Sequence, residues 1–169
     1  MKELKLAGVV KESITDGPGF RFTIFCQGCP HNCQGCHNPG THDFESGYYV
    51  SNDKLIEAIK ANPLLSGVTF SGGEPFCQAE AFYHLAEEIK RQLGLNILVY
   101  SGYTFEELIK MSKENEYINK LLNICDSLVD GKFILEERDL TLNFRGSRNQ
   151  RIVDLPQSLI SGKAVELEY

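Results

Sequence analysis

The stretch Cys26-Gln-Gly-Cys29-Pro-His-Asn-Cys33-Gln-Gly-Cys36-His-Asn-Pro39 places four of the six cysteines within eleven residues. Cysteines this dense, in a chain without a secretory signal, are more often metal ligands than halves of disulfides. The spacing Cys29-x3-Cys33-x2-Cys36 is too short to serve two separate sites. We therefore expect a loop that wraps three sulfurs around one compact cluster.

Two other uses of these cysteines fit the spacing less well. A zinc ribbon needs about a dozen or more residues between its two cysteine pairs, and only three separate Cys29 from Cys33. A bacterial ferredoxin run, C-x2-C-x2-C-x3-C-P, orders its gaps differently and has proline directly after its last cysteine. The spacing therefore favours one cubane iron–sulfur cluster over zinc or structural thiols.

The same spacing resembles the signature of the radical S-adenosylmethionine enzymes, in which three cysteines hold a 4Fe–4S cluster and leave one iron open. The resemblance implies that Cys29, Cys33 and Cys36 are the cluster ligands. It also implies that S-adenosyl-L-methionine chelates the open iron and is cleaved by an electron from the cluster to give a 5′-deoxyadenosyl radical. The other cysteines, Cys26, Cys77 and Cys125, are predicted to be packing residues, because free cysteine is usually buried.

Composition limits the class of protein and its partners. The 169 residues, 42% of them hydrophobic, predict a single domain over residues 1–169 with a real core. The net charge of −6 argues against a nucleic-acid partner, which would require a basic face. The charged start Met-Lys-Glu-Leu-Lys-Leu and the absence of a long apolar run predict a cytoplasmic protein with no membrane segment.

Hydrophobic periodicity predicts alternating strands and helices. The predicted strands are an edge strand at 4–10 and strands at 20–26, 67–70, 96–100 and 126–129. The predicted helices start after the N-cap Ser51, span 78–93, and run from the capping box at 104–107 to about 124 with a break near Ser112. Residues 37–50 are predicted to be a loop. This order predicts an α/β protein with parallel strands, and since it has too few units for a closed barrel of about 250 residues, an open partial (β/α) barrel.

Motifs whose residues could bind a ligand or take part in a reaction follow the predicted strands directly. Besides the cysteines, these are Ser71-Gly72-Gly73-Glu74-Pro75, Ser101-Gly102-Tyr103 and Asp130-Gly131-Lys132. Ends of parallel strands meet at one edge of a sheet, where ligands bind. The glycine pair should admit a ligand close to the backbone, and we expect Glu74 to accept a hydrogen bond from a ligand's ammonium group.

With these motifs placed, the chain resembles the activating proteins of glycyl-radical enzymes, and most closely those of anaerobic, class III ribonucleotide reductase. The shared N-terminal pattern is Asp16-Gly-Pro-Gly-Phe-Arg21 with Phe25-Cys-Gln-Gly-Cys29 and Cys36-His-Asn-Pro39. Two further motifs, Gly102-Tyr-Thr-x-Glu-Glu107 and Arg145-Gly-Ser-x-Asn-Gln-Arg151, resemble the reductase activators in particular. The resemblance implies a hydrogen abstraction from a glycine of the large catalytic subunit, with a reduced flavodoxin or ferredoxin-type protein as electron donor.

The resemblance and the strand-end rule together predict the residues that contact the cofactor, although Asp130 could instead cap a turn. They are Gly35, Cys36, His37, Ser71, Gly72, Gly73, Glu74, Ser101, Asp130 and Lys132. Gly35 stands where many radical S-adenosylmethionine enzymes have an aromatic residue that stacks on adenine, so the sequence leaves open how adenine is held.

Two questions stay open at this point. Arg145, Arg148 and Arg151 concentrate positive charge in an acidic chain and could form a docking surface for the partner, or a solvated loop. The chain could also activate another glycyl-radical enzyme, act on a small molecule, or be a simple iron–sulfur electron carrier.

Overall fold

The computed structural model describes residues 3–169. A seven-stranded sheet with the strand order β3-β1-β2-β4-β5-β6-β7 forms the centre of the protein. The strands are β1 (Glu3–Ser13), β2 (Arg21–Cys26), β3 (Tyr48–Ser51), β4 (Gly67–Gly72), β5 (Asn96–Tyr100), β6 (Ser127–Asp130) and β7 (Arg151–Asp154). Within the described residues the sheet does not close on itself, since β3 and β7 are its two edges. The predicted open α/β architecture is confirmed.

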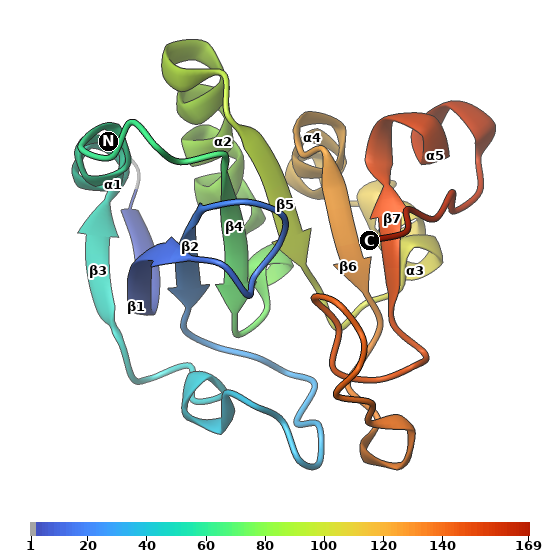
Figure 1. The fold of residues 1–169 in the computed structure, drawn as a ribbon. Coiled ribbons are helices and arrows are strands. Elements are labelled where there is room, and N and C mark those ends of the chain that lie inside the picture. Colours follow the sequence, from blue (N-terminus) through green and yellow to red (C-terminus); the bar gives the residue numbers. More distant parts are fainter. Residues whose placement is uncertain (1–2) are drawn as a thin grey trace.

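The four central strands β2, β4, β5 and β6 are parallel, as the alternation of strands and helices predicts. Their carboxyl ends therefore lie along one edge, at the bottom of Figure 1. Two long segments lie below that edge: the cysteine loop (residues 27–39) and the β6–β7 loop (residues 131–150) (Figure 1). The fold thus brings segments that are about a hundred residues apart in sequence to the same place.

The outer strands differ from the sequence prediction. β1 is not an edge strand, because β3 pairs with it in antiparallel fashion on its outer side. The predicted loop at 37–50 is therefore wrong at its end, where β3 begins at Tyr48. The aromatic and β-branched residues of this strand suit a sheet. At the other edge, β7 pairs in antiparallel fashion with β6 and was not predicted.

Helices cover one face of the sheet (Figure 1). They are α1 (Asn52–Lys60), α2 (Ala79–Leu93), α3 (Phe105–Ser112), α4 (Glu116–Ile124) and α5 (Leu155–Ser161), with short 3-10 turns at Pro39–Thr41, Pro75–Gln78 and Leu135–Glu137. The predicted caps are confirmed: the Ser51 side chain accepts a hydrogen bond from the Lys54 N–H, and Thr104 forms the capping box with Glu107. The break after Ser112 is also confirmed, whereas α5 was not predicted.

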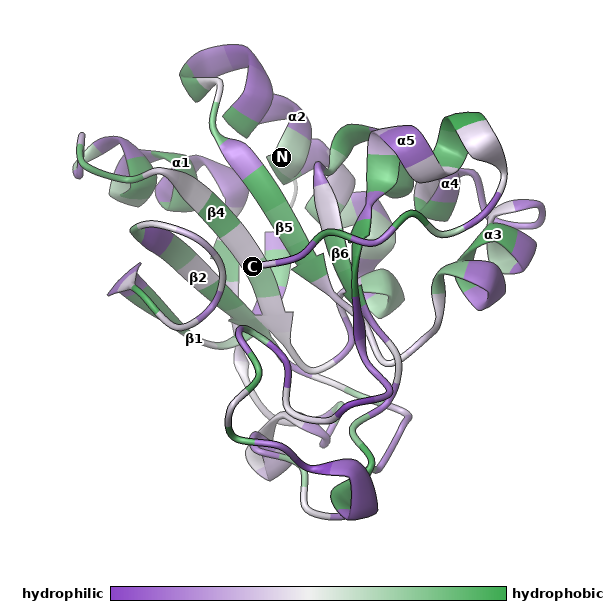
Figure 2. Ribbon diagram, turned by 45° about the vertical axis from the view of Figure 1, so that its right-hand side comes forward, coloured by the Kyte–Doolittle hydropathy of each residue, from purple (hydrophilic) through white to green (hydrophobic). Residues whose placement is uncertain are grey.

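The core lies between the helices and the sheet. Phe22 and Ile24 of β2 alternate toward it and are fully buried, as is Phe70 of β4, whose ring centroid lies 4.5 Å from that of Phe82 on α2. Figure 2 shows hydrophobic residues on the strands and hydrophilic residues on the outward sides of the helices. None of the helices in residues 3–169 combines the length and apolar character needed to cross a membrane.

Arg21 belongs to the Asp-Gly-Pro-Gly motif and is structural. The residue is 1% exposed, and its guanidinium donates to the Thr69 hydroxyl, to the Val68 carbonyl and to the side chain of Asn96. Burial lowers its pKa from the ordinary value. These bonds tie the amino ends of β2, β4 and β5 together, at the end of the sheet opposite the cysteine loop.

Candidate active site

A cavity of about 610 Å³ lies at the carboxyl edge of the sheet, between the cysteine loop and the β6–β7 loop. Nine of the twelve site residues predicted from the sequence line it: Cys29, Cys33, Cys36, His37, Ser71, Gly72, Gly73, Ser101 and Lys132. Gly35, Glu74 and Asp130 do not. The strand-end rule thus brings most of the predicted residues to one cavity, which makes this cavity the candidate site.

The three cysteines of the predicted cluster motif line this cavity together, and each is only partly exposed. Burial raises the pKa of the Cys29 thiol, and a backbone hydrogen bond from His31 opposes that shift. Within residues 3–169 no three metal-ligating side chains converge on a point where a single ion would bind. The three thiols line the same cavity, and this set of donors fits a 4Fe–4S cluster, which takes thiolate ligands from cysteines.

The other three cysteines do not line the cavity. Cys77 is exposed, so the prediction that it is a packing residue is wrong. Cys26 and Cys125 are buried, and burial raises the pKa of both thiols. Cys26 is the last residue of β2 and packs in the main core with Ile24. Such thiols behave as small apolar side chains.

The glycine pair at the end of β4, Gly72 and Gly73, lies against the backbone of the cysteine loop. The Gly73 N–H donates to the Cys26 carbonyl at 2.8 Å, and the Glu74 N–H donates to the Gly28 carbonyl at 2.8 Å. A Cβ on Gly73 would lie 2.3 Å from the Gly28 oxygen, which no side chain can do. The sequence predicted that glycine here admits a ligand, and the structure shows that it admits the backbone of the loop that carries the cysteines.

Glu74 is fully buried beside this contact. Its carboxylate accepts hydrogen bonds from the Ser101 hydroxyl at 3.0 Å, the Gly102 N–H at 2.8 Å and the Phe76 N–H at 3.1 Å, and its Oε1 lies 2.6 Å from His31 Nε2. All these partners belong to the protein, so Glu74 joins the cysteine loop to the loop after β5. Its contact with a ligand's ammonium group stays a prediction.

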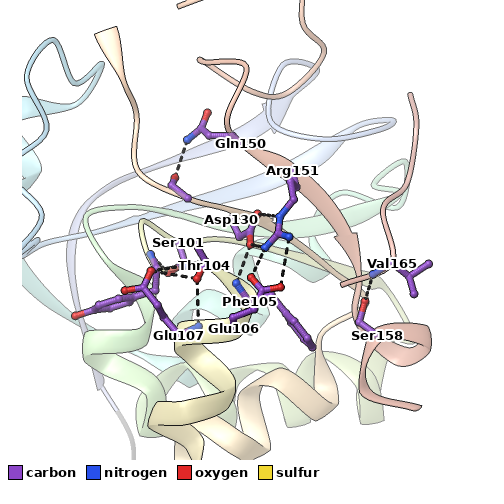
Figure 3. A network of polar contacts seen from close by, with 12 residues as sticks. Ser101, Thr104, Phe105, Glu106, Glu107, Asp130, Gln150, Arg151, Ser158 and Val165 are labelled. Atoms are coloured by element: carbon purple, nitrogen blue, oxygen red, sulfur yellow. Dashed lines mark hydrogen bonds and ion pairs between the residues drawn. The ribbon is translucent and has the colours of Figure 1, made fainter. Parts of the chain in front are cut away.

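Asp130 is likewise engaged by the protein, as Figure 3 shows. It is 1% exposed, accepts a hydrogen bond from the Phe105 N–H at 2.7 Å, and binds Arg151 through both oxygens, at 3.1 and 2.5 Å. Arg151 also reaches Glu106 at 2.6 Å, and the two carboxylates raise the pKa of its guanidinium. The Asp130 oxygens thus fix the start of α3 and the start of β7, and a contact between Asp130 and the cofactor stays a prediction.

The predicted arginine cluster is divided by the structure. Arg151 is held by the two carboxylates just described, Arg145 lines the cavity, and Arg148 is exposed. The three arginines therefore differ in their surroundings. Arg148 is exposed, whereas Arg145 and Arg151 are half-buried.

Two residues that sequence reasoning missed stand close to the cysteines. His31 lies edge-on to Tyr103, with ring centroids 4.5 Å apart, and its position between two cluster cysteines was the available signal. Phe133 lines the cavity and its ring centroid lies 5.0 Å from that of His37. The signal for Phe133 was its position directly after the strand-end motif Asp130-Gly131-Lys132.

Comparison with known proteins agrees with this chemistry. A family described as a 4Fe-4S single cluster domain matches residues 15–153. The chain is similar to the anaerobic ribonucleoside-triphosphate reductase-activating protein of Vibrio cholerae, at 37% identity over 82% of this chain and 90% of the relative. It is 34% identical to the protein of that name from Haemophilus influenzae, over the same shares of the two chains. Among solved structures, QueE from Escherichia coli shares the fold, with a TM-score of 0.50, 17% identity and coverage of 60% of this chain and 53% of that one.

Proposed function

The chain belongs to the family of anaerobic ribonucleoside-triphosphate reductase-activating proteins, and we propose that Cys29, Cys33 and Cys36 hold the cluster with which it activates its reductase. It is an activating enzyme that uses a 4Fe–4S cluster and S-adenosylmethionine. The cluster and S-adenosylmethionine, when bound, supply the radical that takes a hydrogen atom from a glycine of the large catalytic subunit. The observation that carries the site assignment is that these three thiols share one cavity with the strand ends.

The protein's own residues bind and orient in this proposal. The Ser71–Gly73 backbone and the Ser101 loop line the cavity together with the cysteines and would hold the methionine end of the cofactor. Glu74 joins this part of the cavity to the cysteine loop through Ser101 and His31. Lys132 and His37 line the remaining sides. Ligand atoms held between rigid strand ends lose little freedom during the reaction, which favours a reproducible geometry.

The decisive experiment mixes the anaerobically reconstituted protein with the reductase subunit, a reductant and S-adenosylmethionine. We expect a glycyl radical, detected by electron paramagnetic resonance, together with 5′-deoxyadenosine. The Cys33→Ala variant serves as the control that should give neither product. Cleavage of S-adenosylmethionine without a glycyl radical would instead favour another glycyl-radical enzyme or a small molecule as the substrate, and no cleavage at all would favour an electron carrier.

The reductase also completes the enclosure in this proposal. A primary-carbon radical needs shielding from solvent, and the cavity lies between loops at the edge of an open sheet. We propose that the glycine-bearing loop of the reductase closes the cavity, with the exposed Arg148 at its docking surface. A reduced flavodoxin or ferredoxin-type protein is the proposed electron donor. The cytoplasm is the proposed compartment, since all six cysteines are free thiols.

Charge reversal tests this docking surface. Arg148→Glu should lower the glycyl-radical yield by about 2- to 10-fold at low salt, because charges at an interface rim act mainly on association, and the loss should shrink as salt is added. Cleavage of S-adenosylmethionine without the reductase should be unchanged. The matched control is Lys54→Glu, which makes the same change in net charge on the exposed side of α1. An equal loss in both variants would refute a local role for Arg148.

A further inference from the structure

The position of Gly35 shows what replaces the missing aromatic residue beside the last cysteine. Gly35 has φ +76, a backbone conformation that strains other residues. A Cβ there would lie 3.0 Å from Leu135 Cδ1 and 3.3 Å from Phe133 Cε2. Two side chains of the β6–β7 loop therefore occupy the space next to Gly35.

Only one of these two side chains borders the cavity. Phe133 lines it, whereas Leu135 does not. The Phe133 ring is tilted by 47° against the ring of His37, which directly follows Cys36, at a centroid distance of 5.0 Å. The cavity thus has an aromatic surface beside the last cysteine, although the residue that forms it comes from a distant segment.

The Arg145-Gly-Ser-x-Asn-Gln-Arg151 motif holds this segment in place. The Asn149 side chain donates to the Lys132 carbonyl at 2.7 Å, and the Ile134 N–H donates to the Ser147 hydroxyl at 3.2 Å. Ser147 is fully buried and donates to Asn149 Oδ1 at 2.5 Å. The backbone is therefore fixed on both sides of Phe133, which reduces the freedom of its ring before any ligand binds.

We propose that Phe133 is the surface on which the adenine of S-adenosylmethionine stacks, and that Ser147 and Asn149 are positioning residues for it. This inference rests on the proposed function, since it assigns one end of the cofactor that the enzyme uses. A flat aromatic ring offers a π-face to a base, and its fixed backbone leaves little entropy to be lost on binding. The motif therefore serves cofactor binding, a role the sequence did not indicate.

Binding of two probes to the reconstituted holoprotein tests the proposal. Phe133→Ala should raise the dissociation constants of S-adenosylmethionine and S-adenosylhomocysteine by roughly 5- to 150-fold, the range for loss of one base-aromatic stack. Methionine, which has the chelating groups but no adenine, should bind as it does to the unaltered protein. Phe133→Leu keeps apolar volume without a flat ring and should weaken the same two probes, whereas Phe133→Tyr should stay within about threefold of the unaltered protein.

The controls separate this inference from the proposed function. Leu135→Ala removes the other neighbour of Gly35 and should leave all probes unchanged, and Asn149→Ala should weaken only the adenine-containing probes. Unchanged S-adenosylmethionine affinity in Phe133→Ala would overturn the inference, as would an equal loss of methionine binding. If the unaltered holoprotein bound no S-adenosylmethionine, the proposed function would fail and the inference with it.

Discussion

Replacing Cys29, Cys33 or Cys36 with alanine is expected to remove most of the iron from the anaerobically reconstituted protein, and with it the cleavage of S-adenosylmethionine. The reason is that thiolates are the protein's contribution to the cluster, and the described residues that line the cavity include no fourth cysteine that could replace one of them. The measurement is the ratio of iron to protein after removal of unbound iron, together with the spectrum of the reduced cluster.

The buried cysteines provide the matched controls. Cys125→Ala and Cys26→Ala remove the same functional group from sites that do not border the cavity. Both variants should keep the cluster, and each should lose only stability, by about 1 kcal/mol for a small buried apolar group. A cluster that survives Cys29→Ala but not Cys26→Ala would show that the ligand assignment is wrong.

The central strands were predictable because their signal is local. Phe22 and Ile24 alternate with polar residues, and residues 67–71 form a continuous buried run, as expected for a parallel strand. The edge strands were not predictable in the same way. β3 and β7 are short strands with a neighbour on one side only, so the pairing partner, which the sequence does not name, decides their structure. β6 is equally short, but it is buried between two neighbouring strands and its apolar run is visible in the sequence.

For the candidate site, the sequence predicted where residues lie but not which way their side chains face. The strand-end rule correctly brought nine predicted residues to one cavity. It could not tell whether a carboxylate at a strand end faces a ligand or the protein. For Asp130 that depends on Arg151, and for Glu74 on His31, 43 residues away in sequence. The sequence contains both partners of each pair, but it does not show that the loops carrying them pack together.

Glu74→Ala is expected to destabilise the cluster-free protein by about 3–5 kcal/mol, the usual cost of leaving the partners of a buried charged group unsatisfied. The variant would leave the Ser101 hydroxyl and the Gly102 and Phe76 N–H groups without their acceptor. Urea unfolding under reducing conditions measures this loss. Glu74→Gln keeps the shape and one acceptor oxygen, so we expect an intermediate loss of about 1–3 kcal/mol.

The control and the contradicting result follow from the burial of this carboxylate. Glu106→Ala removes an exposed carboxylate that also pairs with a neighbour, Arg151, and should change stability by less than about 1 kcal/mol. If Glu74→Ala unfolded at the same urea concentration as the unaltered protein but bound S-adenosylmethionine weakly, Glu74 would be a ligand contact after all. If stability falls as expected, weak cofactor binding in that variant is explained by the loss of the hydrogen bonds that connect the cysteine loop to the strand ends. The comparison therefore decides whether this carboxylate binds the ligand or builds the wall that binds it.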